Sequence, residues 1–163
     1  MRRLILCFLL MSGSVFAQGQ VPTEKVKKEV VSLQNSVNDV VNTTIAGFGL
    51  LQGAKGTYLD GYGVVLTVEV ALEPPRNPFT GIKSPAEVRT SVTQHHKEIV
   101  EKLTALLKQR TPNLESLIAA ESVTIIVYIL NTNPADLPDL PTQMVFTAKK
   151  QATAEAFISF REY

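Results

Sequence analysis

A run of alternating apolar side chains behind a glycine-containing turn most constrains what this chain can fold into. From Val64 to Leu72 every second residue is Val or Leu, and the residues between them are Val, Thr, Glu and Ala. A period of two that is rich in β-branched residues predicts a strand with one wholly apolar face. Asp60-Gly61 in front of it is a turn dipeptide, so we expect residues 57–59 to form the partner strand of a hairpin.

The glycines around this turn do not fit a phosphate-binding loop. A phosphate cradle needs a helix to begin after the glycines, so that free N–H groups meet the anion. Here a strand follows. Gly61-Tyr62-Gly63 lacks the third glycine of a dinucleotide fingerprint, and the lysine of Gly53–Thr57 precedes its glycine, the reverse of a P-loop. We therefore expect the glycines to allow positive φ or a β-bulge.

The first seventeen residues have the layout of a cleaved secretory signal. Arg2 and Arg3 precede an apolar run over 4–11, and small or medium residues end at Ala17. The sequence predicts a signal peptide over 1–17, a single domain over 18–163 and a periplasmic or secreted bacterial protein. The alternative is an uncleaved membrane anchor. Cys7 is the single cysteine, so a chain cleaved after Ala17 has no disulfide or thiolate chemistry.

Composition narrows the classes of partner. The 163 residues include 16 Lys and Arg against 15 Asp and Glu, and loss of Arg2 and Arg3 would leave 14 basic residues and a net charge of about −1. No run of basic residues forms a concentrated positive surface, so nucleic acid and anionic membrane are not expected partners. No later apolar stretch reaches the roughly 18 residues of a transmembrane helix.

Two helices are predicted from apolar stripes. The first begins near Thr23, and a stripe made almost entirely of valine marks its buried face: Val26, Val30, Leu33, Val37, Val40 and Val41. This helix either packs on a sheet of its own chain or forms a short coiled coil with a partner or a second copy. The second has a Ser84–Glu87 capping box with Pro85 at its first position, and should end near Arg110.

The remaining elements are assigned from shorter patterns. Residues 113–120 suggest a short helix, and 123–130 a central strand with two apolar faces. The proline-containing stretch 131–141 should be a loop, 144–149 another strand, and 152–160 a terminal helix with Phe157 and Phe160 facing inward. The predicted fold class is α+β, with an antiparallel sheet, the 85–110 helix on one face and an N-terminal amphipathic helix.

Candidate chemistry is sparse. His95 and His96 are the only histidines, and neighbours on a helix point about 100° apart, so they do not readily grip one metal. The i,i+4 histidine spacing of H-E-x-x-H is absent, as is the G-x-S-x-G of a nucleophile elbow. Asp136 and Asp139 are too sparse for a calcium loop. We predict no catalytic, cofactor-binding or metal-ligating residue and no cofactor, with Glu69 solvated.

Two stretches resemble a group of uncharacterised secreted bacterial proteins. Tyr58–Leu66 is similar to their Y-L-x-G-x-G-V-x-F type stretch, with Leu66 in place of the final aromatic. Glu121, followed by an apolar strand, a polar loop and Ala148-Lys149-Lys150, resembles them in order. The resemblance implies a secreted bacterial domain. It implies no activity and no site residue.

The leading interpretation is a non-enzymatic exported domain that binds or scaffolds another envelope protein. The valine stripe of the first helix, also a route to self-association, and the proline-rich loop around Phe79 are the candidate partner surfaces. The alternative is a small hydrolase or metal-dependent enzyme centred on His95, His96 and nearby carboxylates, which predicts a concave pocket holding a histidine.

Overall fold

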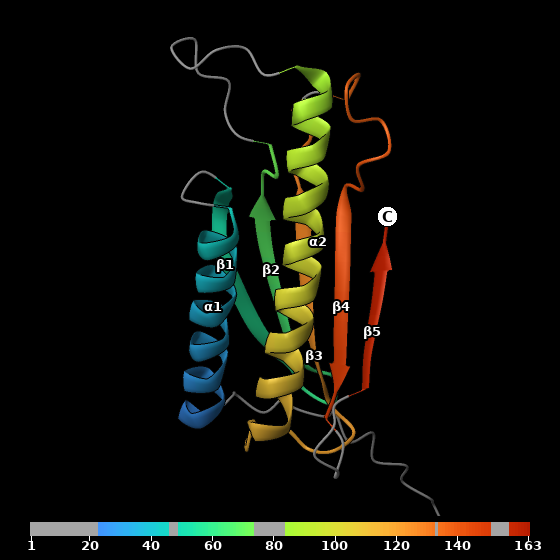
Figure 1. The fold of residues 1–163 in the computed structure, drawn as a ribbon. Coiled ribbons are helices and arrows are strands. Elements are labelled where there is room, and N and C mark those ends of the chain that lie inside the picture. Colours follow the sequence, from blue (N-terminus) through green and yellow to red (C-terminus); the bar gives the residue numbers. More distant parts are fainter. Residues whose placement is uncertain (1–22, 46–48, 74–83, 133, 151–156) are drawn as a thin grey trace, which may run out of the picture.

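The computed structural model describes residues 23–45, 49–73, 84–132, 134–150 and 157–163. The protein is α+β, as predicted: both helices lie on one face of a five-stranded sheet (Figure 1). The elements follow in the order α1 (Glu24–Thr44), β1 (Leu50–Leu59), β2 (Gly63–Val70), α2 (Pro85–Arg110), a 3₁₀ turn (Thr111–Asn113), β3 (Ser122–Ile129), β4 (Gln143–Lys149) and β5 (Phe157–Glu162). The predicted signal peptide and the loop around Phe79 lie outside the described residues.

The sheet is mixed, and the prediction of a wholly antiparallel sheet is wrong. Its strand order is β1-β2-β3-β4-β5. β2 and β3 run parallel, from Gly63 beside Ser122 to Val70 beside Ile129, while the other neighbours are antiparallel. The reason is the long helix between them: α2 carries the chain back along the sheet, and a helical crossover of this kind is what parallel neighbours require.

The glycine turn joins β1 to β2 as expected. Gly61 and Gly63 have φ of 73° and 114°, and the N–H of Tyr62 donates to the carbonyl of Leu59 at 3.0 Å. β1 is longer than the predicted strand, because it begins at Leu50 and not at Thr57. Positive φ is costly for residues other than glycine, so these two positions explain why the turn carries glycines.

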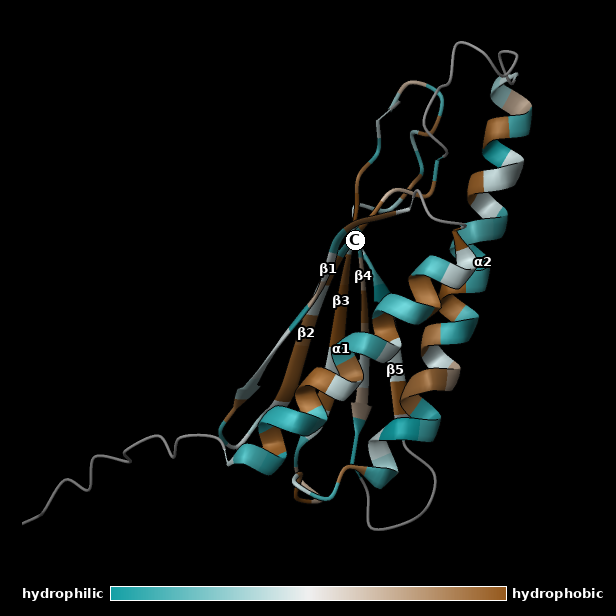
Figure 2. Cartoon of the chain, turned by 90° about the vertical axis from the view of Figure 1, so that its left-hand side faces the viewer, coloured by the Kyte–Doolittle hydropathy of each residue, from teal (hydrophilic) through white to brown (hydrophobic). Residues whose placement is uncertain are grey.

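The core lies between the sheet and the helices. Alternate residues of the central strands point toward the helices and are buried, while the residues between them face away. The brown sides of α1 and α2 in Figure 2 face the strands. The sheet side of the core consists of Val64, Leu66, Val68, Val70, Val123, Ile125, Val127, Met144, Phe146 and Ala148. α1 contributes Val26, Val30, Leu33, Val37 and Val41 to the same core.

Helix α2 begins and ends at the residues that its sequence signals indicate. The Ser84 hydroxyl accepts a hydrogen bond from the N–H of Glu87 at 3.3 Å, and the Glu87 carboxylate accepts one from the N–H of Ser84 at 2.7 Å. The helix ends at Arg110. Together the two capping bonds satisfy N–H groups that the first helical turn leaves unpaired.

The short helix predicted over 113–120 does not form. Only Thr111–Asn113 make a 3₁₀ turn, and the chain then bends without a helix until β3. Glu29 of α1 supplies the reason, because its carboxylate accepts hydrogen bonds from the N–H groups of Glu115 at 3.0 Å and Ser116 at 3.2 Å. These backbone groups are paired with a distant side chain instead of with a helical turn.

The terminal helix predicted over 152–160 is also corrected. Residues 157–162 form the edge strand β5, paired antiparallel with β4; residues 152–156 lie outside the described residues. Phe160 lies beside Phe146, with ring centroids 4.8 Å apart, and remains 39% exposed. Pairing with β4 and this aromatic contact override a helix propensity that came mainly from alanine.

Strand β1 is held against α1 at an irregular stretch. Its register with β2 shifts between Gln52 and Lys55. There the Asn38 side-chain oxygen accepts from the N–H of Ala54 at 2.7 Å, and the Gln34 amide donates to the carbonyl of Ala54 at 3.1 Å. A Cβ on Gly56 would lie 2.7 Å from Val30. The glycine therefore allows close helix packing, a role that the sequence did not reveal.

Candidate functional site

The two histidines of α2 point to different neighbours. Nδ1 of His95 lies 2.9 Å from the carbonyl oxygen of Leu72, just after β2. A carbonyl oxygen only accepts, so Nδ1 carries the proton in this contact. His95 thus joins the helix to the end of β2. His96 lies further round the helix, on the side of β5, and the two rings do not converge on one site.

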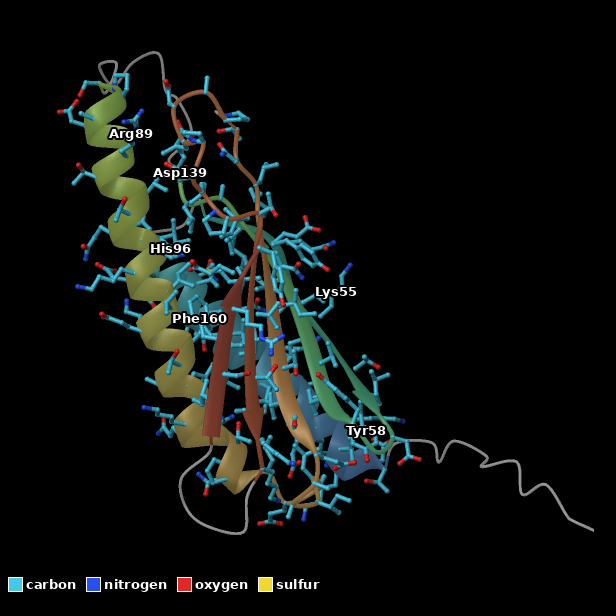
Figure 3. The ribbon with its side chains drawn as sticks, turned by 90° about the vertical axis from the view of Figure 1, so that its right-hand side faces the viewer. Lys55, Tyr58, Arg89, His96, Asp139 and Phe160 are labelled. Atoms are coloured by element: carbon cyan, nitrogen blue, oxygen red, sulfur yellow. The ribbon has the colours of Figure 1, made fainter. Side chains whose placement is uncertain are left out.

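His96 lines a groove of about 360 Å³ between α2, the loop after β3 and the end of β5. The lining residues are Arg89, Val92, Thr93, His96, Asp136, Leu137, Pro138, Asp139, Leu140, Pro141 and Glu162. Figure 3 shows Arg89 and Asp139 at one end of the groove and His96 below them. This volume lies at the lower end of the range of small-molecule sites.

A histidine–carboxylate pair closes one side of this groove. Nε2 of His96 lies 2.7 Å from Oε1 of Glu162. The two atoms are not aligned for a hydrogen bond, so the contact is an ion pair when His96 is protonated. It joins α2 to the last residues of β5.

The opposite wall of the groove is fixed by hydrogen bonds to the backbone of the loop. Nε of Arg89 donates to the carbonyl of Asp136 at 2.8 Å, and the side-chain amide of Asn131 donates to the carbonyl of Leu137 at 2.9 Å. Asp136 and Asp139, which the sequence places in a loop, therefore lie at the groove. Glu73 lies elsewhere: it is buried and accepts from the hydroxyl of Thr132 at 2.9 Å.

The groove offers a weak basis for catalysis. Within the described residues, no group of three or more His, Cys, Asp or Glu side chains is placed to hold a metal ion. His96 and Glu162 form a base–carboxylate pair, but no serine, threonine or cysteine of the groove's lining completes it, apart from Thr93 one turn earlier on the same helix. A nucleophile and its base need hydrogen-bond contact, and no such contact joins Thr93 to His96.

A second polar cluster lies at the far end of the sheet and was not predicted. Glu121, only 2% exposed, accepts from the Tyr58 hydroxyl at 2.6 Å and from the N–H of Ile118 at 3.0 Å. The hydrogen bond to Glu121, and then burial, raise the pKa of Tyr58 to about 12. Lys150 closes the cluster by donating to the carbonyls of Leu114 and, at 2.7 Å, Leu117. Each of these donors has an acceptor, so the role of the cluster is to hold the ends of the strands and the loop before β3 together.

The face of the sheet opposite the helices is uncovered within the described parts of the chain. Val65, Ile126 and Val145 form its half-buried centre, and Tyr128 stands out at 43% exposure. Tyr62 leans over the face and shares a 2.9 Å hydrogen bond with the hydroxyl of Thr124. In Figure 3 Lys55 extends from this face, away from α2. We call this surface the open face.

The valine stripe of α1 is not free. It packs on the chain's own sheet, with Leu33, Val37 and Val41 fully enclosed. Of the two partner surfaces suggested by the sequence, this one is occupied and the loop around Phe79 lies outside the described residues. The open face was not predicted, and the pocket holding a histidine that the enzyme alternative predicts could not be given its lining residues, because both surfaces are assembled from residues that are distant in the chain.

Comparisons with known proteins return nothing. No family model matches the chain, and neither the curated proteins nor the solved structures contain a significant match. Among the described residues no helix is both long and apolar enough to cross a bilayer.

Proposed function

We propose that this protein is an exported, non-catalytic domain that binds another protein of the bacterial envelope through its open face. The observation that supports the proposal is that both helices cover the same side of the sheet (Figure 1). Within the described parts of the chain, no helix therefore covers the other side of the five strands. A broad sheet face with apolar side chains at its centre is a common site of protein association.

The chemistry of the open face favours a protein surface over a small molecule. Its centre combines half-buried Val65, Ile126 and Val145 with the exposed ring of Tyr128, and tyrosine is enriched in protein interfaces. The strand registers place Lys55, Lys149 and Arg161 around this centre, with Glu69 as their acidic neighbour. The partner should then offer an apolar patch bordered by acidic groups.

Export is supported by the first seventeen residues alone. Their basic start, apolar run and small residues up to Ala17 are typical of a signal peptide. The partner is accordingly sought in the periplasm or outside the cell. Amino-terminal sequencing of the protein recovered from that compartment tests this part of the proposal, with cleavage after Ala17 as the expected result.

Site-specific photocrosslinking tests the binding role. A photoreactive phenylalanine analogue replaces Tyr128 on the open face, and the control places it at Val31, which is 53% exposed on α1. Irradiation of whole cells should give a discrete adduct at Tyr128 that is absent at Val31. Substitution Ile126→Arg in the first variant should remove the adduct while the protein stays folded. Equal labelling at Tyr128 and Val31, or none at Tyr128, would contradict the proposal.

The groove supports a second candidate function, a small hydrolase or metal-dependent enzyme. The observation in its favour is the 2.7 Å approach of His96 to Glu162 inside a concave surface. Purified protein would be assayed against ester and amide substrates with added divalent metals. Activity that disappears in His96→Ala and persists in His95→Ala would establish it. A wild-type protein without turnover, or with turnover unaffected by His96→Ala, would remove it.

A further inference from the structure

The two edges of the sheet differ in how they are protected. At β1 the register is irregular, and the side chains of Asn38 and Gln34 form hydrogen bonds with the backbone N–H and C=O of Ala54. β5 pairs with β4 in one unbroken register and contains neither proline nor lysine. Bulges, prolines and charged side chains, lysine above all, are the usual means of preventing a strand from pairing at an edge, and of these β5 has only Arg161 and Glu162. Among the described residues nothing lies beyond β5 (Figure 1).

The hydrogen bonds with β4 show which backbone groups of β5 remain available. Tyr163 and Gln143 exchange both of their backbone hydrogen bonds, at 3.0 and 3.1 Å. In an antiparallel ladder such pairs alternate, so Arg161 and Ser159 also direct their N–H and C=O groups toward β4. The groups of Ile158, Phe160 and Glu162 therefore point outward, away from the sheet.

We propose that β5 pairs with β5 of a second copy of this chain, in an antiparallel arrangement about a two-fold axis at Phe160. In this register Phe160 exchanges both backbone hydrogen bonds with Phe160 of the partner subunit, and Ile158 does so with Glu162 of the partner subunit. All outward groups of Ile158, Phe160 and Glu162 are then used. The two sheets become one continuous sheet.

Side chains select this register over its neighbours. An axis at Phe160 sets Arg161 opposite the partner's Ser159, so the guanidinium meets a hydroxyl. An axis at Arg161 would bring two arginines face to face, which is unfavourable. An axis at Ser159 would set Glu162 beyond the first residue of the partner's strand, because β5 begins at Phe157. The chosen register also brings the exposed ring of Phe160 against its own copy, next to the existing contact with Phe146.

The arrangement leaves room for the helices. The two-fold axis is perpendicular to the sheet, so both copies keep their helices on the same side. In Figure 1 α2 lies in front of the middle of the sheet, on the inner side of β5. A strand added outside β5 therefore does not meet α2. Two-fold dimers of this kind are the commonest closed assemblies of soluble proteins.

Charge variants at Ser159 test the register. Ser159→Arg sets two arginines opposite each other at both symmetric positions and should weaken dimerisation by about tenfold, because like charges directly opposite each other are destabilising. Ser159→Glu meets the partner's Arg161 and should strengthen dimerisation several-fold. The double variant Ser159→Arg/Arg161→Glu should restore it. Dissociation constants would be measured by sedimentation equilibrium on the purified protein.

A proline variant tests the backbone pairing itself. Phe160→Pro removes an outward N–H and should reduce dimerisation by at least about 100-fold, while circular dichroism remains that of the folded monomer. Phe160→Ala is the control that keeps the N–H, and it should weaken the dimer less. A wild-type protein that stays monomeric at high concentration would overturn the proposal. So would a dimer in which the two Ser159 variants behave alike. These results are independent of crosslinking at Tyr128, so the dimer and the proposed binding role can fail separately.

Discussion

Gly63 lies against the backbone of Ser122 so closely that a Cβ atom at Gly63 would stand 2.1 Å from the Ser122 carbonyl oxygen. These residues pair at the start of the parallel β2–β3 ladder. The N–H of Ser122 donates to the carbonyl of Tyr62 at 2.8 Å, which fixes the approach. The hairpin turn and the central pairing of the sheet therefore depend on the same glycine.

Gly63→Ala should lower the free energy of unfolding by at least about 3 kcal/mol, since it adds a backbone clash to a φ of 114°. Gly61→Ala is the matched control. Its φ is 73°, but nothing lies within 4 Å of the added Cβ, so the expected loss is about 1 kcal/mol. Urea unfolding of both variants gives the comparison. Equal losses would show that the contact with Ser122 carries no weight.

Tyr58→Phe should destabilise the protein at neutral pH by about 1 to 2 kcal/mol, because the buried Glu121 loses a hydrogen-bond donor. The pKa of Tyr58 is raised from 10 to about 12. A raised pKa means that the contribution is complete below pH 10 and is lost as the pH rises through 12. The stability difference between wild type and variant should shrink over that interval. A difference that stays constant from pH 8 to 12 would contradict the link between Tyr58 and Glu121.

Asn38→Ala should loosen the attachment of the irregular stretch of β1 to α1. The N–H of Ala54 loses its acceptor, which should cost about 1 to 3 kcal/mol and speed amide exchange at Ala54. Asn38→Asp keeps an acceptor oxygen and should retain most of the protection. If exchange at Ala54 is unchanged in Asn38→Ala, the side chain does not hold the strand.

Ser84→Ala removes one half of the capping box of α2 and should lower stability by about 1 kcal/mol. Ser84→Asp keeps a side-chain oxygen at the same position and should stay close to wild type. Thermal unfolding of the two variants measures the difference. A larger loss for Ser84→Asp than for Ser84→Ala would show that the cap is not what stabilises this helix end.

Elements with local signals were predictable. The alternation after Gly63 indicated β2, and the capping box with Arg110 at the far end indicated α2 to the residue. Each of these signals depends on neighbours within a few positions. The hairpin turn belongs to the same class, since positive φ at Gly61 is a property of the local chain.

Features that depend on distant pairing were not predictable. Three of these features join segments that are far apart in the sequence. They are the parallel pairing of β2 with β3, the pairing of β5 with β4, and the hydrogen bond from the backbone N–H of Glu115 to the Glu29 carboxylate. Because the sequence predicted a helix over 152–160, it gave no reason to place Glu162 on a strand beside α2. The groove lining around His96 therefore could not be predicted. The open face could not be recognised either, since it requires both helices to lie on one side.

The parallel ladder between β2 and β3 has a consequence for biogenesis. Its two strands are separated in the sequence by the whole of α2. β2 therefore cannot pair with β3 until the chain has been synthesised as far as Ile129. During synthesis β2 therefore lacks one of its two neighbours, and it can pair only with β1 until β3 has been made.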